Sequence, residues 1–284
     1  MGDALASWNG LIKPLSQLTV SPLDRGYCFG DGVYEVIALV RGQPWLMEDH
    51  LVRLGNSLEG LKIVHDSKGV ASRIRALLNQ SSVQDGMIYL QITRGTGPRE
   101  HVPKHLLTTN ELMYIDTFDE DSYRKSQRDG VLVMITEDLR WGRCDVKSLN
   151  LLGNVLAQMK AKDAGCHEAL QVTKDHLVTE GTRTNVFFVK DACLITPSTE
   201  QNILPGITRK SVMALARHAG VNVREERVPR SLATGCDEAF LTGTLSEILP
   251  IVKVDDRLIG GGVPGPVTRK LQEMLGAAKR AGKL

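Results

Sequence analysis

The chain has 284 residues, 42% of them hydrophobic, which is enough for one large core or, as the length favours, two domains. Its 35 basic and 33 acidic residues nearly cancel, and lysine and arginine adjoin only in pairs such as Lys279–Arg280. This distribution argues against a nucleic-acid partner, which requires clustered positive charge. The five cysteines include no CxxC pair and the seven histidines no HExxH spacing, so we expect no disulfide framework and no metal site.

The distribution of apolar residues argues against a membrane protein and against a secreted one. No stretch approaches the ~18 consecutive apolar residues of a membrane helix. Residues 1–13 also lack a basic segment followed by an apolar one, which would mark a secretory signal. We therefore expect no membrane partner and a cytoplasmic location.

The first half alternates short strands with one longer helix. Apolar residues recur at helical spacing from Leu51 to Leu61, and Asp49 is the expected N-cap of that helix. The polar run at 119–129 is predicted to be an interdomain linker that closes a smaller N-terminal α/β domain, residues 1–118. The predicted strands of this half are Glu35–Val40, Met87–Thr93 and Leu112–Ile115.

The second half, residues 130–284, is predicted to form the larger C-terminal domain. Apolar residues between Leu151 and Met159 fall on one face of a helix that ends near Gly165. A second helix is predicted at Ile207–His218, before Gly220. Mixed α and β elements in two unequal halves are the predicted fold class (α+β, or mixed α/β). The remaining predicted elements are strands Val131–Ile135, Ala169–Val172, Asn185–Val189, Cys193–Ile195, Glu238–Thr242 and Ile251–Val254, and a helix from Pro266 to Leu275.

Two segments have the composition of anion-binding turns. In Leu204–Thr208 a Gly-Ile-Thr sequence opens a helix, so free backbone N–H groups, a hydroxyl and the positive end of the helix dipole coincide. Leu241–Glu247 is a second hydroxyl-rich turn after a strand, where ligands commonly bind. Taken alone, each is also typical of an ordinary turn.

Two charged residues at strand and helix boundaries suggest catalysis. Lys147 follows a predicted strand and precedes an apolar helix, and a desolvated lysine there would provide a free amine for imine formation. Glu180 precedes a strand that reads as buried, so its carboxylate would be suited to hold a proton on a cofactor ring nitrogen. A solvated lysine and a surface turn have the same local sequences, so neither residue is specific by itself.

Their combination resembles the signature of the pyridoxal 5′-phosphate (PLP)-dependent fold-type IV aminotransferases. This family includes D-amino acid, branched-chain and (R)-amine aminotransferases and aminodeoxychorismate lyase. The similarity runs in order from about Leu18 to Leu275. The motifs that carry it are Asp24–Glu35, His50–Leu54, Lys147–Asn150 (KSLN), Glu180–Asn185 (EGxxxN), Leu204–Arg209 (LxGITR) and Thr244–Glu247 (TxSE).

The resemblance implies a role for each matching residue. Lys147 corresponds to the lysine that forms the Schiff base (aldimine) with PLP, and Glu180 to the carboxylate that faces the pyridine nitrogen. Arg53 corresponds to the phosphate-binding arginine. The other implied cofactor-binding residues are Leu204, which packs against the ring, and the phosphate cup of Gly206, Ile207, Thr208, Gly243 and Thr244.

The segment from Thr93 to His101 resembles the D-amino acid aminotransferases most. There an Arg-x-His pair, Arg99 and His101, together with Tyr34, forms the trap for the substrate α-carboxylate, reaching into the neighbouring subunit. Residues two apart in an extended segment point to the same side. The chain departs from that subfamily at Arg183, where small hydroxyl residues are usual. We expect Arg183 to be a second carboxylate anchor that selects dicarboxylates, or else to point to solvent.

The resemblance thus implies a homodimer with shared active sites that moves amino groups between D-amino acids and 2-oxo acids, such as D-alanine or D-glutamate with 2-oxoglutarate or pyruvate. Three alternatives stay open. A branched-chain L-amino acid or (R)-amine aminotransferase would use the same cofactor, and an aminodeoxychorismate lyase would use the same lysine but fits the carboxylate trap less well. A phosphate- or nucleotide-binding module would leave Lys147 without a catalytic role.

Overall fold

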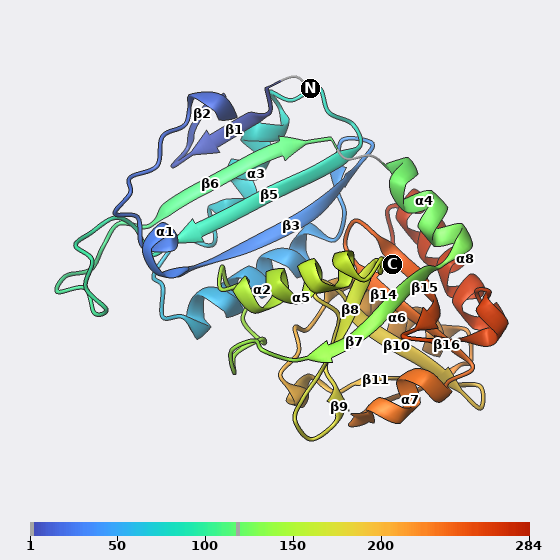
Figure 1. The fold of residues 1–284 in the computed structure, drawn as a ribbon. Coiled ribbons are helices and arrows are strands. Elements are labelled where there is room, and N and C mark those ends of the chain that lie inside the picture. Colours follow the sequence, from blue (N-terminus) through green and yellow to red (C-terminus); the bar gives the residue numbers. More distant parts are fainter. Residues whose placement is uncertain (1–2, 118–119) are drawn as a thin grey trace. The chain divides into compact units, whose positions relative to one another are not determined.

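The computed structural model describes residues 3–117 and 120–284. For residues 120–122 it describes the backbone alone. The chain forms two compact units, which we treat separately (Figure 1). Unit 1 comprises residues 1–118 and Val146–Asn150, and unit 2 comprises residues 119–145 and 151–284. Within the described ranges, no helix combines the length and apolarity needed to cross a membrane, and no cluster of side chains suits a metal ion.

Unit 1 is built on a six-stranded antiparallel sheet in the order β2-β1-β6-β5-β3-β4. Side chains alternate between its two faces, so Ile88, Leu90 and Ile92 of one strand all enter the core. The strands are β1 (Leu5–Trp8), β2 (Leu11–Pro14), β3 (Gly32–Val40), β4 (Gln43–Pro44), β5 (Gly86–Thr93) and β6 (Asn110–Asp116).

Two helices cover the apolar face of this sheet. Helix α2 (Met47–Gly60) contributes Leu54 and Leu58 to the core, and α3 (Val70–Leu78) contributes Val70, Ile74 and Leu77 at helical spacing. A short helix, α1 (Arg25–Phe29), precedes β3; it is capped by the Asp24 side chain.

Lys147 lies in a segment that belongs to unit 1 although its neighbours in the chain belong to unit 2. Residues Val146–Asn150 run along β3: the Tyr34 amide donates to the Lys147 carbonyl (3.1 Å) and the Leu149 amide to the Gly32 carbonyl (3.0 Å). Val33 and Ser148 form an antiparallel bridge between these two bonds. The segment is therefore a short additional strand on the first residues of β3.

Unit 2 contains a ten-stranded mixed sheet in the order β12-β11-β10-β14-β15-β7-β8-β9-β13, with β16 paired to β15. Both of its faces are covered, which is why alternate residues such as Phe187 and Phe188 are equally buried but join different hydrophobic clusters. The strands are β7 (Val131–Glu137), β8 (Glu168–Val172), β9 (Leu177–Val178), β10 (Asn185–Lys190), β11 (Cys193–Pro197), β12 (Asn222–Glu226), β13 (Val228–Pro229), β14 (Glu238–Gly243), β15 (Glu247–Val254) and β16 (Arg257–Leu258).

The helices of unit 2 differ in how much of their surface is buried. On one face of the sheet, α6 and α8 pack Val212, Met213 and Leu271 against Phe187 and Phe240. Helix α5 instead buries small residues, Ala157 and Ala161. The helices are α4 (Glu120–Asp129), α5 (Leu152–Asp163), α6 (Ile207–His218), α7 (Arg230–Gly235) and α8 (Pro266–Ala281), with short 3-10 turns at Thr199–Gln201 and Gly260–Gly262. A further 3-10 turn, Leu15–Gln17, belongs to unit 1.

Most predicted elements are present, and the mixed α/β class is confirmed. The prediction that Asp49 caps α2 is wrong, because the helix begins at Met47 and Asp49 lies in its first turn. A carboxylate in this position interacts favourably with the helix dipole. The polar run at 119–129 carries helix α4. The apolar face predicted between Leu151 and Met159 exists, but it faces outward, with Leu152 70% and Met159 57% exposed.

Candidate active site

The backbone of Lys147 is held from two sides in unit 1. Its carbonyl accepts from the Tyr34 amide on β3, and its amide donates to the Ser57 hydroxyl on α2 (3.1 Å). The half-buried side chain brings Nζ to 4.2 Å from the centroid of the Tyr34 ring. Among the side chains of residues 3–117 and 123–284, no ion pair engages this amine. Lys147 therefore presents a positioned amine that no carboxylate in these ranges holds.

Tyr34 belongs to a row of three tyrosines on the sheet face opposite the core of unit 1. Its ring stacks on Tyr89 of β5 at 6.0 Å between centroids, and Tyr89 stacks on Tyr114 of β6 at 4.9 Å. The Tyr89 hydroxyl donates to Gln91 (2.8 Å), and burial raises the pKa of Tyr89. The phenol of Tyr89 is therefore neutral at physiological pH, and the stack fixes the Tyr34 ring beside Lys147.

Arg53 is fixed on α2 by a buried carboxylate. Glu35 of β3 receives two hydrogen bonds from Arg53, Nε to Oε1 and Nη2 to Oε2, both 2.8 Å, and a third contact of 2.7 Å from His50 Nδ1. Burial opposes ionisation of Glu35, but the charge and hydrogen bonds of Arg53 and the His50 contact outweigh it and lower its pKa to about 2. These contacts with Glu35 fix the orientation of the Arg53 guanidinium.

Arg99 and His101 lie on the exposed segment that follows β5. The Arg99 guanidinium is 5.1 Å and the His101 ring 5.8 Å from the centroid of the Phe29 ring. Arg25 fixes the intervening backbone through hydrogen bonds to the carbonyls of Glu100 (2.6 Å) and His101 (3.1 Å). The two side chains therefore lie on the same side of their segment, against one ring.

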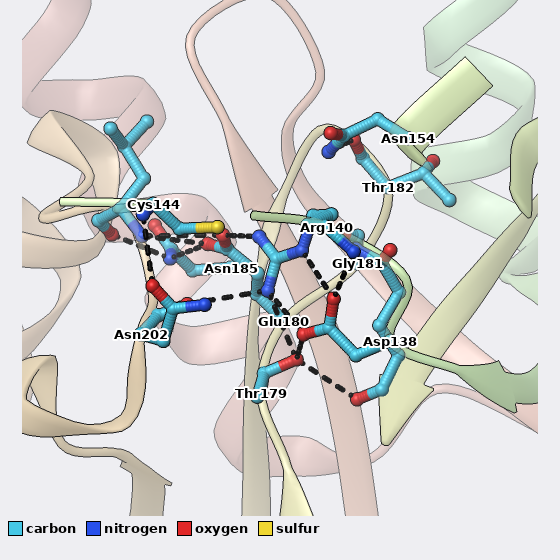
Figure 2. Close-up of polar contacts among 12 residues, drawn as sticks. Asp138, Arg140, Cys144, Asn154, Thr179, Glu180, Gly181, Thr182, Asn185 and Asn202 are labelled. Atoms are coloured by element: carbon cyan, nitrogen blue, oxygen red, sulfur yellow. Dashed lines mark hydrogen bonds and ion pairs between the residues drawn. The ribbon is translucent and has the colours of Figure 1, made fainter. Parts of the chain in front are cut away.

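In unit 2, Glu180 is part of a buried cluster of two carboxylates and one guanidinium (Figure 2). Arg140 donates from Nε to Asp138 Oδ1 (2.9 Å) and from Nη2 to Asp138 Oδ2 (2.7 Å). Its remaining nitrogen, Nη1, forms a short ion pair with Glu180 Oε1. The Thr179 hydroxyl donates to Asp138 Oδ2 (2.8 Å). All three charged side chains are less than a tenth exposed.

Two more donors fix the Glu180 carboxylate. Asn185 donates to Oε2 at 2.8 Å, and the Leu204 amide lies 3.1 and 3.2 Å from the two oxygens. Burial raises the pKa of Glu180 to about 7, and the charge and hydrogen bond of Arg140 oppose this only in part, because Asp138 repels the same carboxylate. The neighbours of Glu180 thus fix its orientation, but the single charge of Arg140 does not balance both Glu180 and Asp138.

The anion cradle was predicted at the start of α6. The amides of Ile207 and Thr208 are among the first helical N–H groups, and within the described part of the chain neither has an acceptor. Gly206 must lack a side chain, since a Cβ there would lie 2.0 Å from Asn185 Oδ1. Thr242, opposite Asn185 on β14, has a buried hydroxyl for which the described residues offer no hydrogen-bond partner. Gly243, the last residue of β14, and Thr244, in the turn that follows, are both half-buried.

Arg183 lies on a tight turn between Glu180 and β10. Glu168 supports this turn from beneath: its Oε1 accepts from the Arg183 amide (2.8 Å) and from the hydroxyls of Thr184 (2.9 Å) and Thr182 (3.1 Å). Asn154 of α5 donates to the Thr182 carbonyl (2.6 Å). The Arg183 side chain is 54% exposed, with Nε 4.0 Å from Glu168 Oε2. The turn is rigid, whereas its arginine points outward.

Each unit therefore gathers its own share of the predicted site. Unit 1 brings Lys147 to Tyr34 and fixes Arg53, while unit 2 brings Glu180, Leu204 and the start of α6 together. Sequence reasoning missed Asp138, Arg140 and Glu35. Oppositely charged residues two apart directly after a predicted strand, as at 138–140, were the available signal for the first two.

The chain is similar to known proteins over most of its length. The family model described as Amino-transferase class IV matches residues 32–254. The D-alanine aminotransferase of Bacillus licheniformis is 38% identical over 270 residues, covering 94% of this chain and 94% of that protein. The D-alanine aminotransferase of Staphylococcus epidermidis strain RP62A is 37% identical over 268 residues, with 93% and 94% covered.

Solved structures agree in fold. The branched-chain amino acid aminotransferase of Escherichia coli superposes with a TM-score of 0.94 at 23% identity (99% of this chain, 96% of that chain). The T.th. branched-chain amino acid aminotransferase, with pyridoxamine 5′-phosphate, gives 0.93 at 25% identity (100% and 96%). The 4-amino-4-deoxychorismate lyase of Pseudomonas aeruginosa gives 0.83 at 27% (95% and 98%). The chain is an aminotransferase with the fold-type IV architecture, and it belongs to the class IV aminotransferase family.

Proposed function

We propose that this enzyme is a PLP-dependent D-amino acid:2-oxo acid aminotransferase, acting on D-alanine or D-glutamate with 2-oxoglutarate or pyruvate. The observation that carries the cofactor assignment is the buried cluster around Glu180: Asp138 and Glu180 share the single guanidinium of Arg140. This cluster lacks one positive charge, which a protonated pyridine nitrogen would supply. The D-alanine aminotransferases that resemble the chain support the substrate class.

The phosphate end also fits the cofactor. The unpaired amides at the start of α6, the close approach at Gly206 and the unpartnered Thr242 hydroxyl form a donor set for an oxyanion. Ile207 and Thr208, with Gly243 and Thr244, would hold the phosphate in unit 2, and Arg53, oriented by Glu35, would supply the guanidinium.

Within this assignment each residue has a defined task. PLP, when bound, supplies an electron sink for the substrate carbanion. Lys147 Nζ would hold the cofactor and, as a free amine, take the proton from the substrate Cα. Glu180 would keep the ring nitrogen protonated, and Leu204 would pack against the ring. Tyr34 would fix the amine from the other side through the contact seen in unit 1.

The substrate carboxylate would be held by Tyr34 and by the Arg99–His101 pair, whose side chains lie on one side of their segment. Arg183, which is exposed and attached to a rigid turn, would bind the distal carboxylate of D-glutamate or 2-oxoglutarate. A planar guanidinium pairs with a carboxylate through two parallel hydrogen bonds, so both arginines suit this task.

We further propose that the enzyme is a homodimer in which Arg99 and His101 reach the partner's site. The segment that carries them is exposed, with Val102 79% and Leu106 82% accessible. Helix α5 adds an outward apolar face in unit 2. Exposed apolar side chains gathered on one face of a helix, as on α5, are typical of a protein–protein interface. The change Leu156→Glu, at an exposed position of α5, should give a monomer in analytical ultracentrifugation, whereas Lys162→Glu should leave the dimer intact.

The assignment is tested by adding PLP to cofactor-free protein. Wild type and a Lys162→Ala control should gain visible absorbance, and Lys147→Ala should not. The loaded enzyme should transfer amino groups from D-alanine to 2-oxoglutarate. A colourless wild-type protein, or equal absorbance in Lys147→Ala, would contradict the cofactor assignment.

The branched-chain amino acid aminotransferases are a second candidate because a solved structure of that class superposes with a TM-score of 0.93 at 25% identity. A donor panel of D-alanine, L-leucine, L-valine and (R)-1-phenylethylamine separates the two. Ready turnover of L-leucine or L-valine without D-alanine would select the second candidate. Pyruvate release from aminodeoxychorismate would select the lyase.

A further inference from the structure

The side chain of Asp138 contacts Arg140, the arginine that also contacts Glu180, and the Thr179 hydroxyl beside it. Asp138 follows β7, and its amide donates to the Val172 carbonyl of β8 (2.9 Å), which fixes its backbone to the sheet. Oδ1 accepts from the Arg140 amide (3.1 Å) and from Nε (2.9 Å). Oδ2 accepts from Arg140 Nη2 (2.7 Å) and from the Thr179 hydroxyl (2.8 Å). Every oxygen contact of Asp138 thus goes to Arg140 or to its neighbour Thr179.

Arg140 divides its donors unequally between the two carboxylates. Two of its nitrogens form a side-on, bidentate pair with Asp138, while a single nitrogen, Nη1, reaches Glu180. Nη2 also contacts the Asn202 carbonyl at 3.3 Å, which fixes the guanidinium plane (Figure 2). Bidentate pairing is the stronger and more directional form. Arg140 is therefore held primarily by Asp138 and only secondarily by Glu180.

The charge balance of the cluster follows from this division. Two carboxylates face one guanidinium in a region where each side chain is less than a tenth exposed. The other contacts of Glu180 come from the Asn185 amide group and the Leu204 backbone, which are neutral donors. Without Asp138, the guanidinium and Glu180 would form a balanced pair with little attraction for a further cation.

We infer that Asp138 is a positioning residue of the active site. It holds Arg140 through a bidentate pair, so the cluster lacks one positive charge at Glu180. Glu180 therefore attracts a cationic ring nitrogen. The inference rests on the function proposed above, because it concerns how that site selects the protonated form of its cofactor. Asp138 acts through Arg140 and Glu180 and touches no reacting atom.

The test compares the binding of PLP with that of its 1-deaza analogue, in which a C–H group replaces the ring nitrogen and no proton can be taken up. Wild type should bind PLP more tightly than the analogue, and the ratio of the two dissociation constants measures the demand for a cation. In Asp138→Asn this ratio should fall about tenfold, the equivalent of one pKa unit. The matched control is Asp145→Asn, which removes an exposed carboxylate paired with Arg143 and should leave the ratio unchanged.

The outcomes are distinct. If Asp138 were needed only for folding or packing, Asp138→Asn would weaken both ligands equally and keep the ratio, which would overturn the inference. If wild type bound neither ligand, the proposed function itself would fail. Should Asp138→Asn not fold, Asp138→Ser provides the same comparison with a small, neutral acceptor. Asp138→Glu, which retains the charge, should keep the wild-type ratio.

Discussion

Each unit contains a buried cluster of ionic side chains, and the two clusters differ in charge balance. The contrast is between a balanced cluster and one with an excess negative charge. In unit 1, Glu35 lies between the guanidinium of Arg53 and the ring of His50, so one carboxylate is matched by one permanent cation. In unit 2, Asp138 and Glu180 share Arg140. The pKa of Glu35 is lowered to about 2, whereas that of Glu180 is raised to about 7.

The difference shows that burial alone does not decide how a carboxylate ionises. Burial disfavours the charged form of both groups, but only Glu35 receives a full set of charged hydrogen bonds. The balanced cluster suits a structural task, which is to fix the direction of Arg53. The unbalanced cluster suits a binding task, because a cationic ligand, such as the ring nitrogen proposed above, would complete its charge.

The largest expected effect is in the balanced cluster. Arg53→Met leaves Glu35 buried without its cation, so the free energy of unfolding of the cofactor-free protein should fall by about 3–5 kcal/mol in urea denaturation. Arg143→Met breaks an exposed pair with Asp145 and should cost less than about 1 kcal/mol. Equal costs for the two changes would show that Glu35 does not depend on Arg53.

The two clusters should also respond to pH in opposite directions. Relative to Glu180→Gln, the wild-type protein without cofactor should lose up to about 3 kcal/mol as pH rises from 4.5 to about 7, because the folded state binds the Glu180 proton more tightly than the unfolded state. Relative to Glu35→Gln, wild type should instead lose stability as pH falls below 4.5 towards about 2. Urea unfolding at several pH values measures both. If the stability of wild type relative to Glu180→Gln and relative to Glu35→Gln changed with pH in the same direction, the comparison would be contradicted.

A smaller effect is expected at the anion cradle of unit 2. Thr242 has a buried hydroxyl with no partner, so Thr242→Val should stabilise the cofactor-free protein by about 1 kcal/mol. Thr196 is equally buried but donates to the Val186 carbonyl (2.8 Å), and Thr196→Val should destabilise the protein by about 1 kcal/mol. Thermal unfolding of the two variants provides the measurement, and a loss of stability in both would show that Thr242 has a partner.

The smallest effect concerns a third buried carboxylate, Glu168, whose nearest cation is the exposed Arg183. Arg183→Ala should change the free energy of unfolding by less than about 1 kcal/mol, because exposed charges contribute little. It should raise the KM for 2-oxoglutarate about two- to fivefold and leave the KM for pyruvate unchanged. An equal change for both acceptors would remove Arg183 from dicarboxylate recognition.

Local sequence patterns predicted the positions of helices and strands better than the contacts between residues that are far apart in the chain. The alternation in β5 and the helical spacing in α6 are visible in the sequence because a single buried face imposes each period. Helix α6 even has its predicted bounds, Ile207 to His218. The apolar residues of α5 mislead as a core signal, since the helix turns them outward and buries alanines instead.

The site depended on long-range contacts that no local pattern contains. Arg140 and Glu180 are 40 residues apart, and Glu35 and Arg53 are 18 apart on different elements. Family resemblance supplied Arg53 and Glu180 but not their partners, because charged residues are common in loops and only the folded sheet shows which of them meet. Lys147 likewise had no distinguishing local sequence until its motif was matched.

The strand formed by Val146–Asn150 has a consequence for how the molecule is made. Its partner, β3, is synthesised more than 100 residues earlier, and the intervening chain builds the rest of unit 1 and the first part of unit 2. Unit 1 therefore remains incomplete on the ribosome, with the Tyr34 amide unpaired, until the chain has passed residue 150. A fragment that stops at residue 118 would hold most of unit 1 but lack the Val146–Asn150 strand and, with it, Lys147. Unit 1 is thus completed by the segment that carries the lysine proposed to hold the cofactor, so a chain truncated before it would lack that amine.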